Sequence, residues 1–169
     1  MSGEIVNRVA KSNLITIDLE DLYPKGKRVR LDISEWLYEG LILREKDFRE
    51  AVKEHQWEQY QNCYVALYCS TDAIIPSWAY LLISASLSNI AEKCVVGDLE
   101  LLENLIFNDI IQNFSVEEFK DRPVIVKGCS DKRIPESAYV ELCQKLVPVV
   151  RSLMFGEACS SVPLFKKKK

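Results

Sequence analysis

One strand–loop–helix pattern occurs twice in this chain, and it constrains the fold more than any other feature. Each copy starts with a short apolar run, CYVALYC at 63–69 and PVIVKG at 123–128, which is typical of a strand covered on both faces. Each run leads to Cys-Ser, a loop of four or three residues, and I-P-x-x-A-Y. Pro76 and Pro135 are expected at the first helical position, where a missing N–H does no harm. This placement would leave an isoleucine as each helix N-cap, which is a poor cap.

Other segments extend the same α/β pattern. Apolar and polar residues alternate at 14–20 and at 28–33, as in half-buried strands. The turn residues YPKGK between these segments predict that they pair as a hairpin. The predicted helices begin at Asp47, Pro76, Asp98 and Pro135. The fold prediction is therefore an α/β protein with a central mixed sheet flanked by helices, in which the strand–Cys-Ser loop–helix unit is duplicated.

Composition limits the class of protein. The 169 residues carry a formal charge of −3, and the last four residues are all lysine. Without those four of its 22 basic residues the chain has 18 against 25 acidic ones, so we expect no nucleic-acid partner. We predict a single α/β domain over 1–165 and a disordered lysine tail at 166–169.

The cellular location is inferred from what the sequence lacks. No apolar run approaches the ~20 residues that span a bilayer, so we expect no membrane partner. The N-terminus has no apolar signal region, and six cysteines without such a signal indicate the reducing cytoplasm.

Three cysteines are the candidate metal ligands. Cys69 and Cys129 stand where a strand ends and the chain turns toward a helix N-terminus, a position that stabilises a thiolate, and Cys159 lies in a predicted loop near the C-terminus. The residues that follow them, which could tune a bound metal or cofactor through hydrogen bonds, are Ser70, Ser130 and Ser160. Three thiolates suit zinc or an iron–sulfur cluster, and the candidates for a fourth ligand are Asp72, Asp131, His55 or solvent. The sequence therefore predicts a metal-binding accessory protein.

Two other interpretations stay open. One of the same cysteines could act as the nucleophile of a thiol-dependent enzyme or as a sulfur acceptor, although the single histidine leaves no recognisable Cys-His-Asn spacing. Alternatively, the cysteines are packing residues and the protein is an interaction module without a metal.

The three cysteine-containing segments CYVALYCSTDAIIPSWAYLL, VIVKGCSDKRIPESAY and GEACSSVPLFKK resemble a bacterial family catalogued as domain of unknown function 2480. The resemblance runs over essentially the whole chain. The genes of this family tend to lie near those of sulfur-mobilising iron–sulfur cluster assembly. The resemblance thus implies, by association, a role that touches cluster assembly and partners among the iron–sulfur assembly proteins.

Overall fold

The structure is a computed structural model that describes residues 13–128, 131–157 and 160–168. The chain divides into two compact units. The inserted unit comprises residues 24–106, and the outer unit comprises residues 1–23 and 107–169. The long helix α3 (Leu99–Asn113) starts in the first of these and ends in the second.

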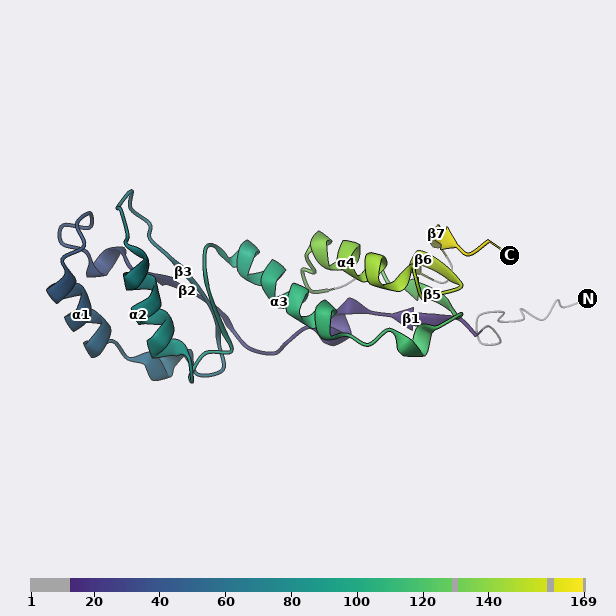
Figure 1. The fold of residues 1–169 in the computed structure, drawn as a ribbon, viewed down its shortest axis with the longest axis horizontal. Coiled ribbons are helices and arrows are strands. Elements are labelled where there is room, and N and C mark those ends of the chain that lie inside the picture. The colour runs from purple at the N-terminus through teal and green to yellow at the C-terminus, as the bar shows by residue number, and fades with distance from the viewer. Residues whose placement is uncertain (1–12, 129–130, 158–159, 169) are drawn as a thin grey trace, which may run out of the picture. The chain divides into compact units, whose positions relative to one another are not determined.

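The inserted unit is a parallel three-stranded sheet with two helices. Its strands are β2 (Arg28–Asp32), β3 (Tyr64–Tyr68) and β4 (Lys93–Val96), in the order β2-β3-β4. Its helices α1 (Glu45–Glu54) and α2 (Ser77–Leu87) lie side by side (Figure 1) and contact each other. The core between helices and sheet contains Phe48, Ala79, Ile83, Val65 and Leu67, each 1% exposed or less. Helices α1 and α2, which connect the parallel strands, therefore bury their apolar faces on the sheet.

The outer unit has a mixed four-stranded sheet. Its strands are β1 (Ile15–Ile17), β5 (Pro123–Val126), β6 (Ser152–Glu157) and β7 (Ser160–Lys166), in the order β1-β5-β6-β7. The first three are parallel and β7 is antiparallel to β6. Helix α4 (Glu136–Leu146) lies beside α3 (Figure 1), where the Asn108 amide donates to Glu141 Oε2 at 3.1 Å. Phe107, Leu142 and Leu146 fill the core of this unit.

Short 3₁₀ helices connect these elements. They are η1 (Leu19–Leu22), η2 (Ser34–Trp36), η3 (Trp57–Tyr60) and η4 (Glu117–Phe119). Within the described residues, no helix is long and apolar enough to cross a membrane.

The duplicated unit of the sequence is present in both folded units. A single constant offset in residue number relates Pro76 to Pro135, and in each copy the alanine three residues later donates its N–H to the proline carbonyl at 3.0 Å. The same offset relates Asn62 to Asp121, which both have a positive φ, 58° and 54°. Their N–H groups donate to the carbonyls of Ile90 and Val149, which the offset also relates, at 3.0 Å each. The two copies therefore share backbone geometry well beyond the Cys-Ser loops.

The fold prediction is confirmed: helices and strands combine in an α/β structure with a mixed sheet of four strands, to which the structure adds a second sheet. Lys166 ends β7 one residue beyond the predicted domain boundary, and the single domain itself stays a prediction.

Two local predictions are wrong. The segments 14–20 and 28–33 do not form a hairpin, because β1 pairs with β5 and β2 pairs with β3. Pro76 and Pro135 are N-caps with extended ψ angles of 146° and 140°, so the isoleucines before them are not caps at all. The loop predicted at Cys159 falls between the end of β6 and the start of β7 in the sequence, and Cys159 itself lies outside the described residues.

Candidate functional site

The candidate site lies at the carboxyl end of the inserted unit's sheet. Strand β2 ends at Asp32, which is in register with Tyr68 at the end of β3. Cys69, Ser70 and Thr71 follow directly. In parallel α/β sheets this edge is where ligands and partners are commonly bound. We call it the inserted-unit rim, formed by residues 32–42 and 69–76.

Asp32 fastens the Cys-Ser loop to this rim. Its Oδ1 accepts the N–H groups of Ser34 and Ser70, both at 3.0 Å, and the Ser70 hydroxyl donates to Ser34 Oγ at 3.0 Å. Burial raises the pKa of Asp32, but the hydrogen bonds from Ser70 and Ser34 outweigh it and lower the pKa from 3.8 to about 2. A carboxylate that is ionised at neutral pH therefore holds the loop after β3 in place.

Thr71 joins this loop to the turn around Gly40. Its hydroxyl donates to the Gly40 carbonyl at 2.6 Å, and Cys69 Sγ lies 3.4 Å from the same hydroxyl oxygen. Because the single hydroxyl proton is used by Gly40, the Cys69 thiol is the donor to Thr71. Cys69 also packs partly buried against the inserted unit's core. These contacts tie the Cys69 side chain to Thr71 and to the core of the inserted unit.

The two loops of the rim expose large apolar side chains. Their relative exposures are Tyr38 39%, Leu41 56%, Ile42 54% and Ile74 94%. Arg44 stacks on the Tyr38 ring, with 3.2 Å between its guanidinium carbon and the ring centroid. Glu39 and Asp72 are exposed beside these residues, so the surface is apolar with an acidic border.

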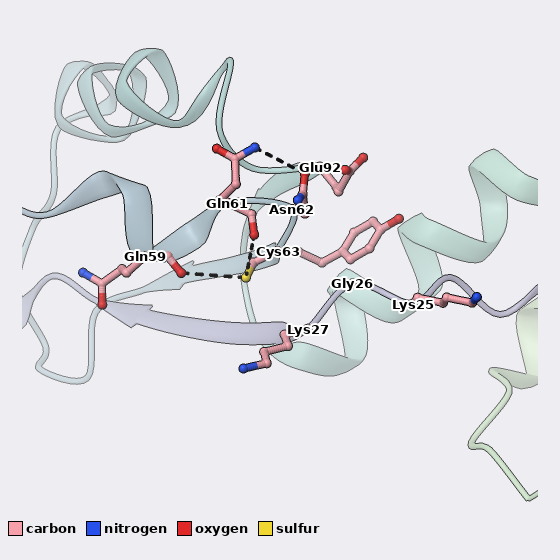
Figure 2. A pocket seen from close by; sticks show the side chains of 9 residues that line it. Lys25, Gly26, Lys27, Gln59, Gln61, Asn62, Cys63 and Glu92 are labelled. Atoms are coloured by element: carbon pink, nitrogen blue, oxygen red, sulfur yellow. Dashed lines mark hydrogen bonds between the residues drawn. The ribbon is translucent and has the colours of Figure 1, made fainter.

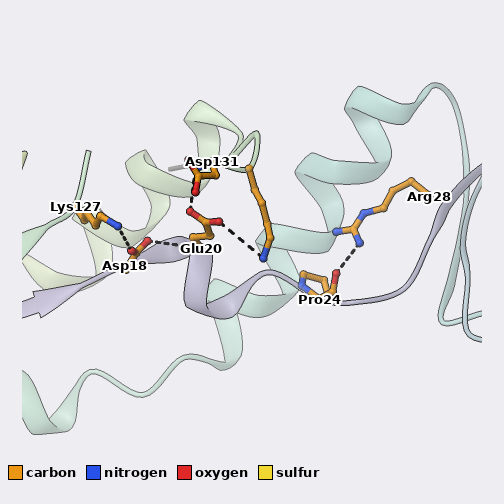
Figure 3. A network of polar contacts seen from close by, with 7 residues as sticks. Asp18, Glu20, Pro24, Arg28, Lys127 and Asp131 are labelled. Atoms are coloured by element: carbon orange, nitrogen blue, oxygen red, sulfur yellow. Dashed lines mark hydrogen bonds and ion pairs between the residues drawn. The ribbon is translucent and has the colours of Figure 1, made fainter. Parts of the chain in front are cut away.

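The corresponding rim of the outer unit is polar. Lys127 Nζ lies 2.6 Å from Asp18 Oδ2, and Glu20 Oε2 accepts the N–H of Asp131 at 2.9 Å (Figure 3). Lys132 Nζ is 4.0 Å from the other oxygen of Glu20. Burial raises the pKa of Asp18, but the hydrogen bonds from Lys127 and from the Glu20 N–H outweigh it and lower the pKa, so this side chain stays ionised at neutral pH. Carboxylates thus fasten the loop after the second strand in both units.

The metal-binding prediction is corrected by these positions. Cys69 and Ser70 lie at the inserted-unit rim, and Ser160 is the first residue of β7, where it pairs with Glu157. Cys129, Ser130 and Cys159 lie outside the described residues. Across the described parts of the chain, no group of three or more His, Cys, Asp and Glu side chains could hold a metal ion. The prediction of a zinc or iron–sulfur accessory protein is therefore not retained.

The candidate fourth ligands have other surroundings. His55 Nε2 is 2.9 Å from the Tyr60 hydroxyl, and its ring packs between Trp36 and Trp57 at centroid distances of 5.0 and 4.7 Å. Burial lowers the pKa of His55, so this side chain is a neutral member of an aromatic cluster. Asp72 and Asp131 are exposed loop residues.

A hollow of about 600 Å³ lies at the opposite, amino end of the inserted unit's strands. Lys25, Lys27, Asn62 and Glu92 contribute to its wall (Figure 2). The thiol of Cys63 points at the carbonyl oxygens of Gln59 and Gln61, 4.0 and 3.6 Å from its sulfur. Cys63 is only 5% exposed and belongs to the core of the inserted unit, so it is a packing residue.

The chain is an α/β protein in which a unit with a parallel three-stranded sheet is inserted into a unit with a mixed four-stranded sheet. The chain belongs to the family described as Protein of unknown function (DUF2480), whose family model matches residues 3–167. The resemblance found in the cysteine-containing segments is thereby confirmed. Searches of curated proteins and of solved structures find no match.

Sequence reasoning missed the role of Asp32 and the exposure of Ile74. Asp32 bonds to Ser70, which is 38 residues away in the sequence, and no local pattern predicts that contact. The signal for Ile74 was present in the repeat. Aligned from the shared prolines, TDAIIP and SDKRIP place Ile74 opposite Arg133.

Proposed function

We propose that this protein is an interaction module that docks a partner protein on the inserted-unit rim. Ile74 carries the proposal, because 94% of its surface is exposed in the free chain. Burying such a side chain against a partner contributes roughly 1.5–3 kcal/mol. Tyr38, Leu41 and Ile42 are exposed on the second loop of the rim, which the Thr71–Gly40 hydrogen bond joins to the loop of Ile74.

Folding does not require an apolar residue at this position. The matching residue of the outer unit, Arg133, is exposed in a loop that leads to the same Pro–helix junction. The neighbouring Ile75 and Ile134 are the residues that pack, since Ile134 is only 8% exposed and Ile75 contacts the inserted unit's core. Exposed apolar side chains that gather in a patch mark interaction sites, and Ile74 shares the rim with exposed Tyr38, Leu41 and Ile42.

The rim is preorganised for docking. The Thr71–Gly40 and Asp32–Ser70 hydrogen bonds fix both loops before a partner arrives, which reduces the entropy lost on binding. The acidic border from Glu39 and Asp72 favours a partner segment that combines apolar and basic side chains. Neither Cys69 nor a metal is needed for this role.

We take the sulfur-mobilising iron–sulfur assembly proteins as the partner class and the cytoplasm as the location. The gene association of the family supports these choices.

Hydrogen exchange tests the proposal. Purified assembly proteins are added singly to the full chain, and exchange is followed for every peptide. Slower exchange at 37–43 and 69–76, with no change in the matching outer-unit loop at 131–135, is the expected result. Binding that protects other segments and leaves these two loops unchanged would refute the docking surface.

A further inference from the structure

Basic side chains gather around a hollow of about 570 Å³ at the amino ends of the outer unit's strands β5 and β6. The hollow is lined by Asp121, Arg151, Ser152, Lys166, Lys167 and Lys168. These residues come from the turn before β5, the start of β6 and the end of β7.

Backbone hydrogen bonds fix all three segments. Asp121 donates its N–H to the Val149 carbonyl at 3.0 Å, and Arg151 donates to the Arg122 carbonyl at 2.9 Å. Lys167 in turn donates to the Arg151 carbonyl at 2.9 Å, which extends the β6–β7 ladder past the end of the strand. The backbone around the hollow is therefore held in one arrangement before any ligand binds.

The charges of the hollow are not balanced. Lys167 Nζ pairs with Asp121 Oδ1 at 3.0 Å, which neutralises the one acid in the wall. Among the described residues, Arg151, Lys166 and Lys168 have no acidic partner within 4.0 Å. Three uncompensated cations in a chain of net charge −3 repel one another and attract an anion.

The backbone of this turn does not require a positive charge at residue 151. The constant offset between the two copies relates Arg151 to Glu92, and Glu92 lines the matching hollow of the inserted unit (Figure 2). Glu92 makes the same backbone bond, from its N–H to the Cys63 carbonyl at 2.9 Å. The same turn therefore forms with either Glu92 or Arg151, so its backbone geometry does not require the Arg151 guanidinium. That guanidinium can bind a ligand.

We propose that the outer-unit hollow binds a phosphoryl anion. The planar guanidinium of Arg151 matches two phosphate oxygens, while Lys166 and Lys168 add point charges and the Ser152 hydroxyl adds a neutral donor. The volume of about 570 Å³ lies in the range of small-molecule sites. This site is independent of the docking surface.

Titration calorimetry with inorganic pyrophosphate tests the site on the full chain at about 0.15 M salt. Saturable binding is expected for the native protein. Arg151→Gln should weaken it at least tenfold, and Arg151→Glu, which copies the inserted unit, should abolish it. Lys53→Gln on α1 removes an exposed lysine elsewhere and should change the affinity less than twofold.

The second arm replaces pyrophosphate with vesicles that contain phosphatidic acid, and it identifies the source of the phosphoryl group. Binding of either probe that depends on Arg151 supports the site. Binding that is equal in Arg151→Glu and native protein overturns it. The proposal is also overturned if neither probe binds saturably. It is overturned as well if the protein binds a short RNA but neither of the two probes.

Discussion

Ile74 and Arg133 occupy the same position in two copies of one strand–loop–helix unit, and both side chains face solvent. The shared fold explains the conserved Pro–helix junction of the two copies but not this difference. This difference between the two copies is the basis of the proposed docking surface. Arg151 and Glu92 form a second such pair.

Replacing Asp32 by Asn should lower the free energy of unfolding by about 1–3 kcal/mol, because a neutral amide oxygen is a weaker acceptor for the N–H groups of Ser34 and Ser70. Urea denaturation at pH 7 measures the change. Asp72→Asn, on the exposed part of the same loop, should stay within about 0.5 kcal/mol. Equal effects of the two variants would show that Asp32 does not fasten the loop.

The contribution of Asp32 should depend on pH. Its pKa in the folded protein, about 2, is below the ordinary 3.8, so ionised Asp32 stabilises the fold above pH 3.8. This stabilisation is lost as the pH falls from about 4 toward 2. The difference in the free energy of unfolding between native protein and Asp32→Asn, measured by urea denaturation, should therefore shrink over that range. A constant difference would contradict the assigned pKa.

Arg28 should not tolerate lysine. Its guanidinium makes two bonds to Glu103, at 2.9 and 2.8 Å, and two to the carbonyls of Pro24 and Gly26. Lysine cannot satisfy this planar set, so Arg28→Lys should cost about 1–3 kcal/mol. Arg49→Lys is the control, because its pair with Glu45 is exposed and contributes under about 0.5 kcal/mol. A small, equal effect at both sites in urea denaturation would refute this role.

The core of the outer unit depends on α4. Leu142 is fully buried, and Leu142→Ala should cost about 2–5 kcal/mol through lost burial and the cavity left behind. Val140, two residues earlier, is 56% exposed, and Val140→Ala should cost less than about 1 kcal/mol. Thermal and urea unfolding of both variants check the difference. Similar losses would mean that the face of α4 is misassigned.

Local signals in the sequence predicted the elements but not all of their partners. The apolar runs at β3 and β5 are confirmed as strands, and Asp98 caps α3 by accepting the Leu101 N–H at 2.8 Å. The hairpin prediction was wrong because strand pairing depends on segments far apart in the sequence. The segments 14–20 and 28–33 each pair in parallel with a strand that comes later in the chain.

The candidate site was predicted only in its location. The sequence predicted that Cys69 lies at the end of a strand, and it does. The contact between its thiol and the Thr71 hydroxyl could not be predicted from residue spacing. The exposed Ile74, and Arg151, which has no acidic partner among the described residues, were recognised only by comparing the two copies residue by residue. The sequence repeat aligns only a few residues, and the shared backbone hydrogen bonds extend that alignment.

Docking through Ile74 is tested most directly by one dissociation constant. Ile74→Arg gives the inserted unit the residue that the outer unit already tolerates, so the variant should unfold at the same urea concentration as the native protein. Its affinity for the assembly protein that binds the native chain should fall at least tenfold, which corresponds to about 1.4 kcal/mol. An unchanged dissociation constant in the folded variant would contradict the docking role.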